Sequence, residues 1–224
     1  MRFPDRAGVM ILDGCPLFPQ AMAPLFIFEP RYRRLLADTL EGSRLMCLAM
    51  RQPGSKQERP CKVAGLGMVR VAVKNPNGTS NLVLQGVSRV RIGRALQTKP
   101  YRIHRIEPLD EPVGESLVLD ALAARILDLL ETRLRMDTTF PLSALVKLAG
   151  THVAQGPVRI EDCLKALRQL EEPAVLGDLV ASLLLPDAAM RQIVLQTVDV
   201  GERLRHVADF LMAEIDRLQK NPAL

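Results

Sequence analysis

Arginine and lysine are the side chains whose number and spacing point most directly to chemistry in this sequence. Between Arg59 and Ile106 there is no Asp or Glu, yet the segment holds ten cations: Arg59, Lys62, Arg70, Lys74, Arg89, Arg91, Arg94, Lys99, Arg102 and Arg105. Cations without nearby carboxylates attract phosphate groups, because binding neutralises charge and releases counterions. One prediction is therefore an anion or nucleic-acid patch made of Arg89, Arg91, Arg102 and Arg105.

Strand alternation puts Arg89 and Arg91 on one face of such a patch. Aromatic residues, however, are scarce: the chain has no Trp, two Tyr and six Phe, and most Phe residues lie near the N-terminus. RNA-binding sheets normally stack bases on exposed aromatic side chains. The alternative is that these cations face water or an acidic part of the same chain. Both interpretations stay open.

Catalytic and metal-binding motifs are missing from the sequence. It contains no Gly-x-x-x-x-Gly-Lys-Ser/Thr loop, no Gly-x-Ser-x-Gly elbow and no His-Glu-x-x-His. A serine–lysine dyad stays open, since its members assemble in space. Neither the three histidines nor the four cysteines have metal-ligand or disulfide-scaffold spacing: His104, His152, His206, Cys15, Cys47, Cys61 and Cys163. We therefore expect no metal, no cofactor and no enzymatic activity.

Charge divides the chain into two parts. Residues 1–106 carry 18 Lys and Arg against 6 Asp and Glu, whereas residues 107–224 carry 12 against 19. The segment 107–114 is polar and holds two prolines and a glycine, which is typical of a linker. We predict two domains, residues 1–112 and residues 113–224.

The first part has the pattern of a small sheet. Short apolar or alternating runs, separated by Gly, Pro and Asn, predict strands at residues 44–50, 68–74, 82–84 and 101–106. Pro30 can occupy the first turn of a helix, and residues 51–60 form a polar loop that we expect to be mobile. Several strands and one helix indicate a barrel-like sheet.

The second part has helical periodicity. Ser116 can cap a helix with an apolar face running to Leu134, and further helices are predicted at residues 161–170, from Pro173 to before Pro186, and from Asp199 to Leu218. A break is expected at Gly156 and Pro157. Helices with one apolar stripe each bury those stripes against one another, so an antiparallel bundle is predicted. The fold class is α+β.

Several segments carry a family resemblance. Cys15-Pro16-Leu17-Phe18-Pro19 and the run from Pro24 to Arg33 are joined by strand-like segments at residues 65–71 and 81–92 and by helical segments at residues 176–182 and 198–204. Together they resemble the N-terminal domain of Lon proteases, with one departure at Gln20, where relatives usually have glycine. The resemblance implies a PUA-like pseudobarrel followed by a helical bundle, in a stand-alone form without the ATPase and peptidase domains.

The resemblance also implies a function. It favours a noncatalytic module that binds unfolded or partner polypeptides; an RNA- or small-ligand-binding PUA-like domain is the alternative, and an unrecognised hydrolase ranks last. The chain has no apolar run long enough for a membrane span, and Asp13 and Pro16 interrupt the first candidate signal-peptide core. We therefore expect a cytoplasmic protein without membrane partners.

The candidate polypeptide-binding residues surround the start of the first helix. Arginines there are disfavoured by the helix dipole, which indicates a compensating role. We predict that Arg31 or Arg34 holds a carboxylate or backbone carbonyls of a partner in a groove between barrel and bundle, while Phe18 and Phe26 form its apolar walls. The competing explanation is a local ion pair between Glu29 and Arg33.

Overall fold

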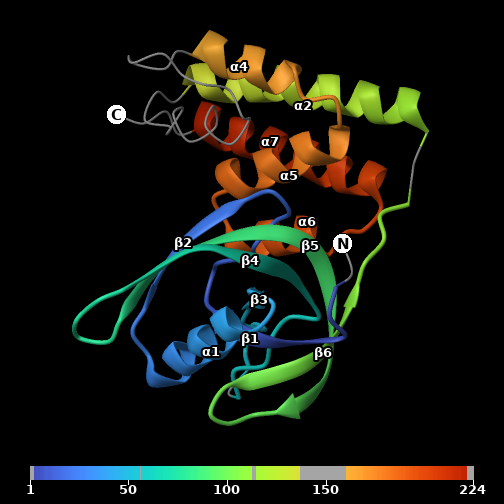
Figure 1. Ribbon diagram of the computed structural model, residues 1–224. Coiled ribbons are helices and arrows are strands. Elements are labelled where there is room, and N and C mark those ends of the chain that lie inside the picture. The colour runs from blue at the N-terminus through green and yellow to red at the C-terminus, as the bar shows by residue number, and fades with distance from the viewer. Residues whose placement is uncertain (1–2, 56, 113–114, 137–159, 221–224) are drawn as a thin grey trace. The chain divides into compact units, whose positions relative to one another are not determined.

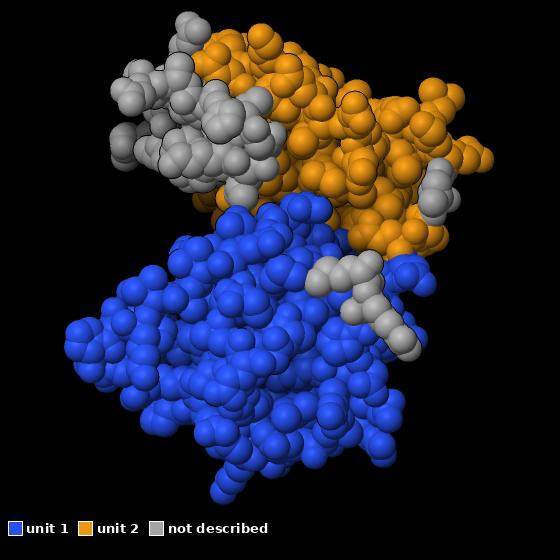
Figure 2. Space-filling model, in the orientation of Figure 1, with its two compact units in different colours: residues 1–110 blue, residues 111–224 orange. Residues whose placement is uncertain are grey.

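The computed structural model describes residues 3–55, 57–112, 115–136 and 160–220 (Figure 1). It divides into two compact units, residues 1–110 and residues 111–224, coloured separately in Figure 2. Each unit is described by itself below. The expected break at Gly156 and Pro157, and His152, lie outside the described residues.

Unit 1 is a six-stranded sheet with one helix. Its elements are β1 (Arg6–Leu12), β2 (Met22–Ile27), α1 (Pro30–Glu41), β3 (Leu45–Met50), β4 (Val63–Lys74), β5 (Ser80–Gln97) and β6 (Arg102–Pro108). The strand order is β2-β5-β4-β3-β1-β6, and β5 also pairs with β6. The pairings β5-β4-β3-β1-β6-β5 therefore form a closed ring, with β2 added outside it. Among the described strands, β1 and β3 are the only parallel pair.

Strand β3 is an uninterrupted apolar run because it lies inside the core. All six of its residues are buried, as expected for a strand covered on both faces. On one side Met46 and Leu48 pack with Leu35 of α1, and on the other Cys47 packs with Leu66 and Val90. Burial raises the pKa of the Cys47 thiol to about 12, so this cysteine is protonated and unreactive at neutral pH.

The segment Cys15 to Pro19 is held by close backbone packing. A Cβ atom on Gly65 would lie 2.1 Å from the Leu17 carbonyl oxygen, and one on Gly86 would lie 1.9 Å from the Phe18 carbonyl oxygen. Only glycine permits so close an approach. Gln20 has a φ of 65° and its N–H donates to the Gly86 carbonyl at 2.9 Å. This left-handed conformation is one that glycine adopts more readily than glutamine.

Helix α1 begins at Pro30, as predicted, and its buried face packs on the sheet. The Tyr32 hydroxyl accepts a hydrogen bond from the Ile11 N–H at 3.1 Å and donates one to the Ile11 carbonyl at 2.9 Å. These two bonds attach the first turn of α1 to β1. Tyr32 therefore fixes where the neighbouring arginines of that turn lie.

Unit 2 is helical throughout its described residues apart from connections. It contains α2 (Ser116–Met136), α4 (Ile160–Arg168), α5 (Pro173–Leu184), α6 (Ala188–Gln196) and α7 (Val200–Lys220). α7 packs along both α2 and α5, and the predicted apolar stripes are buried, including Ile126, Leu130, Leu204 and Leu211. Asp199 caps α7 as predicted, accepting a hydrogen bond from the Glu202 N–H at 2.8 Å.

Several local predictions need correction. Ser116 is the first residue of α2 instead of its cap, and its hydroxyl donates to the Asp120 carboxylate. β1 and α6 were not predicted. β4 and β5 contain the predicted strand-like segments at residues 65–71 and 81–92, but both strands extend beyond these segments and beyond the runs at residues 68–74 and 82–84. A backbone bridge joins Arg51 and Pro60 at the two ends of the polar loop, whose expected mobility stays a prediction.

Candidate functional site

An exposed apolar surface lies on the outer side of β2, β5 and β4. Two cross-strand rows define it: Pro24 pairs with Val83, which pairs with Val71, and Phe26 pairs with Asn81, which pairs with Val73. Residues directly opposite one another share a face of the sheet. Val71 is 51% exposed, Val73 55% and Phe26 56%. We call Pro24, Phe26, Val71, Val73 and Val83 the apolar sheet face.

Strand alternation produces this surface. Leu25 and Ile27 alternate with Pro24 and Phe26 along β2. Ile27 belongs to the core and Leu25 packs against it, so Pro24 and Phe26 must point outward. Phe28, just beyond the strand, is 60% exposed, and its ring stacks on Phe26 with centroids 6.0 Å apart. β2 pairs only with β5 among the described strands. Its second edge is therefore open to an added strand, although Pro24 contributes no N–H.

Phe18 and Phe26, both predicted to form the apolar walls of a binding groove, differ in their exposure to solvent. Phe26 belongs to the apolar sheet face, whereas Phe18 is 0% exposed. Phe18 therefore offers no surface to a partner in this structure, because its segment is packed beneath Gly65 and Gly86. The sequence reasoning missed Val71 and Val73, although their alternation with Ala72 and Lys74 could have revealed them.

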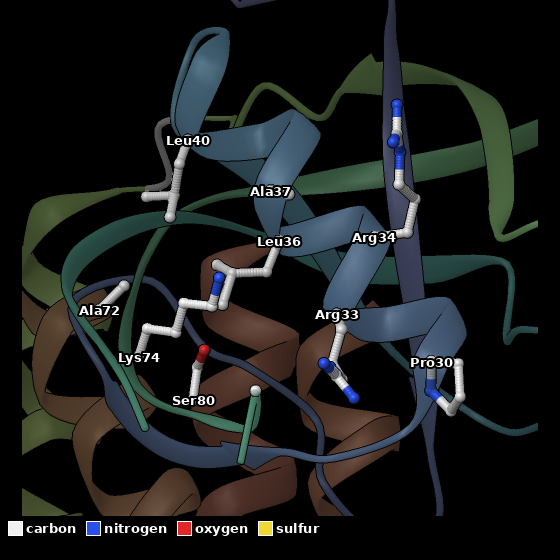
Figure 3. Close-up of a pocket in the computed structure, with 10 residues that line it drawn as sticks. Pro30, Arg33, Arg34, Leu36, Ala37, Leu40, Ala72, Lys74 and Ser80 are labelled. Carbon is white, nitrogen blue, oxygen red and sulfur yellow. The ribbon is translucent and has the colours of Figure 1, made fainter. Parts of the chain in front are cut away.

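A pocket of about 540 Å³ lies between α1 and the hairpin that joins β4 and β5. Its lining is largely apolar, and its polar lining residues are Arg33, Arg34, Lys74 and Ser80. Figure 3 shows that the side chain of Arg34 extends away from the space between helix and hairpin. The hairpin turn lies at residues 75–78, with the Gly78 N–H donating to the Asn75 carbonyl. Sequence reasoning placed Arg34 at a binding site but did not select Arg33 or Lys74.

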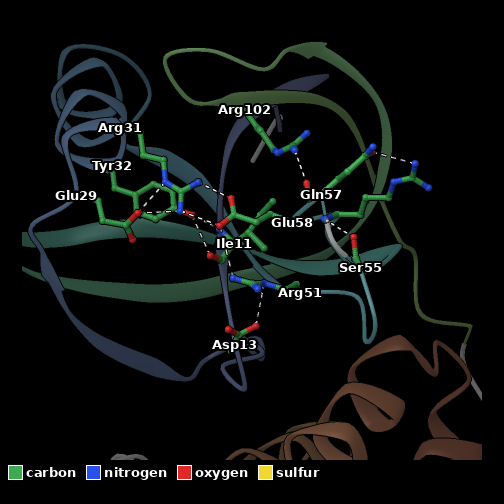
Figure 4. A network of polar contacts seen from close by, with 11 residues as sticks. Ile11, Asp13, Glu29, Arg31, Tyr32, Arg51, Ser55, Gln57, Glu58 and Arg102 are labelled. Atoms are coloured by element: carbon green, nitrogen blue, oxygen red, sulfur yellow. Dashed lines mark hydrogen bonds and ion pairs between the residues drawn. The ribbon is translucent and has the colours of Figure 1, made fainter.

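Arg31 is engaged by acidic side chains of unit 1. Its guanidinium donates to Glu29 at 2.9 Å and to both carboxylate oxygens of Glu58, and it lies 4.5 Å from the centroid of the Tyr32 ring (Figure 4). The hydrogen bond to Glu58 raises the pKa of Arg31 above its already high value. Arg51 joins the same cluster by contacting Glu58 and Asp13. Arg31 therefore ties the loop at residues 51–60 to α1.

Arg34 also has a local partner. Its Nε lies 3.0 Å from a carboxylate oxygen of Asp38, one turn further along α1. Asp38 accepts a second hydrogen bond from the Tyr101 hydroxyl at 2.7 Å, and chiefly this bond lowers the pKa of Asp38. Burial, followed by Asp38, raises the pKa of Tyr101 to about 12. The ion pair expected between Glu29 and Arg33 does not form; Glu29 pairs with Arg31.

The four cations of the predicted anion patch do not form one free surface. Arg89 is 1% exposed, and its guanidinium lies 5.9 Å from the centroid of the Phe18 ring. The other three are bonded at the surface: Arg91 to Glu107 at 2.8 Å, Arg105 to Asp5 at 3.7 Å and Arg102 to the Gln57 carbonyl at 2.7 Å. The two surface ion pairs offset part of the charge that the sequence suggested.

Metal and membrane features are not seen in the described part of the chain. It contains no cluster of three or more His, Cys, Asp or Glu that could hold a metal ion, and none of its helices combines the length and apolar content that crossing a bilayer requires. His104 is buried, and its Nδ1 hydrogen-bonds to the Gly93 carbonyl at 2.9 Å. This histidine has a structural contact within the sheet.

Comparison with solved structures identifies the fold. The chain is similar to the N-terminal domain of Mycobacterium avium complex Lon protease, with a TM-score of 0.67 and 18% identity, covering 92% of this chain and 98% of that one. It is also similar to a Lon N-terminal domain protein from Xanthomonas campestris, with a TM-score of 0.59 and 18% identity, covering 91% and 97%. At these identities the similarity establishes the fold.

Sequence comparison then gives the family. Residues 7–213 match the family described as ATP-dependent protease La (LON) substrate-binding domain, and the chain belongs to it. It is 25% identical to Lon protease of Dictyoglomus thermophilum over 219 residues and 27% identical to that of Azospirillum brasilense over 208. These alignments cover 96% and 91% of this chain but 25% and 23% of the relatives. The chain thus spans about a quarter of each relative's length, and the matched family is the substrate-binding domain.

Proposed function

We propose that this protein is a noncatalytic module that binds unfolded polypeptides through the apolar sheet face. The observation that carries this proposal is the exposure of Phe26 on β2 and of Val71 and Val73 on β4, the two strands that flank β5. Contiguous exposed apolar surface marks interaction sites, because water is more favourably displaced from it than from a polar surface. The description of the family as a substrate-binding domain supports the same conclusion.

The geometry favours an extended, apolar partner. Pro24, Phe26 and the valines present a surface one strand long and three strands wide, bordered by the open edge of β2. An extended chain lying along β2 can put alternate side chains on this surface. The proposal includes the finer fold assignment: the closed ring of strands corresponds to a PUA-like pseudobarrel, and the boundary after residue 112 separates two independently folding domains.

The test replaces the exposed apolar side chains with polar ones. Phe26→Ser combined with Val73→Ser should weaken binding of a fluorescently labelled, permanently unfolded protein by tenfold or more, measured by anisotropy. Each substitution removes an apolar side chain that the bound polypeptide would bury, and full burial of such a side chain contributes about 1.5–3 kcal/mol. Leu96→Ser is the matched control, because Leu96 is 43% exposed on β5 but lies outside the apolar sheet face.

Two results would count against the proposal. One is unchanged affinity in the double variant; the other is an equal loss in Leu96→Ser. A parallel titration with single-stranded RNA at two salt concentrations tests the alternative function. Tight, strongly salt-dependent RNA binding, together with no binding of unfolded protein, would replace the polypeptide proposal with the nucleic-acid one.

A further inference from the structure

The pocket between α1 and the β4–β5 hairpin concentrates positive charge without a counterion. None of the described residues that line it is acidic. Arg34 is paired with Asp38, whereas the side chains of Arg33 and Lys74 have no hydrogen bond or ion pair with any described residue. Figure 3 shows the side chains of Arg33 and Lys74 extending toward the space between helix and hairpin. Two unneutralised cations at one pocket provide a binding site for an anion.

The surrounding chain positions these two cations. Lys74 and Ser80 face each other in register at the base of the hairpin. Arg33 comes from the first turns of α1, which Tyr32 holds against β1. A Cβ atom on Gly78 would lie 2.1 Å from Nη2 of Arg33, so the guanidinium rests directly against this glycine of the hairpin turn. Ser80 is 8% exposed, and its hydroxyl has no hydrogen bond to a described residue.

The rest of the pocket specifies what accompanies the anion. Leu36, Ala37, Leu40 and Ala72 form an apolar lining, and no described lining residue is aromatic. A nucleotide base would find no ring to stack on, and inorganic phosphate would leave the apolar lining uncovered. A carboxylate next to an apolar side chain fits both the cations and the apolar lining. A guanidinium binds the two carboxylate oxygens together, and the lining covers the apolar side chain.

We propose that this pocket binds a carboxylate of a polypeptide together with a neighbouring apolar side chain. Arg33 and Lys74 hold the carboxylate, the Ser80 hydroxyl donates to it, and Leu36 and Leu40 contact the apolar group. A volume of about 540 Å³ is within the range of ligand pockets and accommodates one or two residues. The carboxylate comes either from the C-terminus of a chain or from an Asp or Glu side chain.

This inference goes beyond the proposed function and stands on separate residues. The apolar sheet face uses the outward side of β4, represented by Val71 and Val73, whereas Ala72 and Lys74 line the pocket on the other side of the same strand. Loss of one site therefore leaves the other intact. A short carboxylate peptide should bind Phe26→Ser/Val73→Ser as well as it binds the parent.

The first experiment compares three labelled peptides on the intact chain by anisotropy. One ends in Leu-Leu with a free carboxylate, the second is the same peptide amidated, and the third is amidated with Glu beside the two leucines. The free acid should bind about tenfold or more tightly than the amide, as expected for charge-assisted hydrogen bonds. Equal affinity of all three peptides would overturn the proposal. Tighter binding of the free acid than of the plain amide identifies the C-terminal source, and tighter binding of the third peptide than of the plain amide identifies the side-chain source.

The second experiment removes the two cations. Arg33→Gln and Lys74→Gln should each weaken binding of the free acid about tenfold while leaving the affinity of the amide unchanged. Arg94→Gln is the matched control, because Arg94 is an exposed cation of β5 without a partner among the described residues. An equal loss in Arg94→Gln would show a general charge effect and overturn the proposal. Thermal unfolding checks the fold of each variant, and the comparison of acid with amide on the parent chain stands even if a variant unfolds.

Discussion

Two arginines, one from each unit, have different roles. In unit 2, Arg203 of α7 is 0% exposed; it donates to both carboxylate oxygens of Glu111, and its Nε lies 3.6 Å from Asp178. Burial opposes its charge, but these carboxylates raise its pKa overall. In unit 1, Arg33 is exposed at a pocket without any carboxylate. The number of cations in a segment therefore says less about function than the pairing of each one does.

The cations of α1 repeat this contrast within one helix. Arg31 and Arg34 have carboxylate partners, and Arg33, between them, has none among the described residues. A paired arginine contributes to stability and is occupied, whereas an unpaired one costs little to replace and is available to a ligand. The following predictions test that separation.

The largest effect is expected from Arg203→Ala. It leaves the nearly buried Asp178 and the partly exposed Glu111 without their shared cation, which costs about 3 kcal/mol in free energy of unfolding. Urea unfolding followed by circular dichroism at the helical band measures the change. Arg205→Ala, an exposed position on the same helix, is the control and should change stability by no more than about 0.5 kcal/mol. Equal losses of stability in Arg203→Ala and Arg205→Ala would contradict the distinction between paired and unpaired arginines.

A smaller, pH-dependent effect is expected from Glu58→Gln. The hydrogen bond from Arg31 lowers the pKa of Glu58 below its ordinary value of 4.5. Stability from this carboxylate is therefore fully present above that value and is lost as the pH falls through the folded-state pKa. Because the side chain is 33% exposed, we expect a loss of about 1 kcal/mol at pH 7.

At pH 3 the difference between Glu58→Gln and the parent should be smaller than at pH 7, because below the ordinary pKa of 4.5 the unfolded chain binds a proton at Glu58 that the Arg31 pair in the folded protein opposes. Urea unfolding at both pH values provides the measurement. Glu41→Gln, an exposed position at the end of α1, should show no such change. A difference between Glu58→Gln and the parent that grows toward low pH would contradict the role given to the Arg31–Glu58 pair.

The smallest stability effect is expected from the pocket cations. Arg33→Gln and Lys74→Gln should each leave the free energy of unfolding within about 0.5 kcal/mol of the parent, since neither loses a partner in the described structure. Arg31→Gln, which loses Glu29 and Glu58, should cost more. A loss above about 1 kcal/mol in Arg33→Gln would show that this arginine supports the fold instead of a ligand.

Local signals allowed much of the fold to be predicted. Pro30 began a helix, Asp199 capped one, and the apolar stripes of α2 and α7 were buried as expected. β1 was missed because Gly8 interrupts its pattern; that glycine is required by Leu35, whose Cδ1 would lie 2.2 Å from an added Cβ. α6 was missed although Asp187 caps it at the Ala189 N–H. β1 was missed because the contact between Gly8 and Leu35 is a tertiary one. α6 could have been predicted, because its cap Asp187 is visible in the sequence.

The candidate sites divide in the same way. The sequence by itself determined an α+β chain, the family resemblance, and a cationic, apolar start to α1, because these depend on residue type and spacing within a few turns. Tertiary structure alone decided that Phe18 is buried while Phe26 is exposed, and that Arg33 faces a pocket while Arg31 is paired. Burial and pairing depend on partners far away in the sequence, such as Gly86 and Glu58, and the local sequence pattern does not indicate these partners.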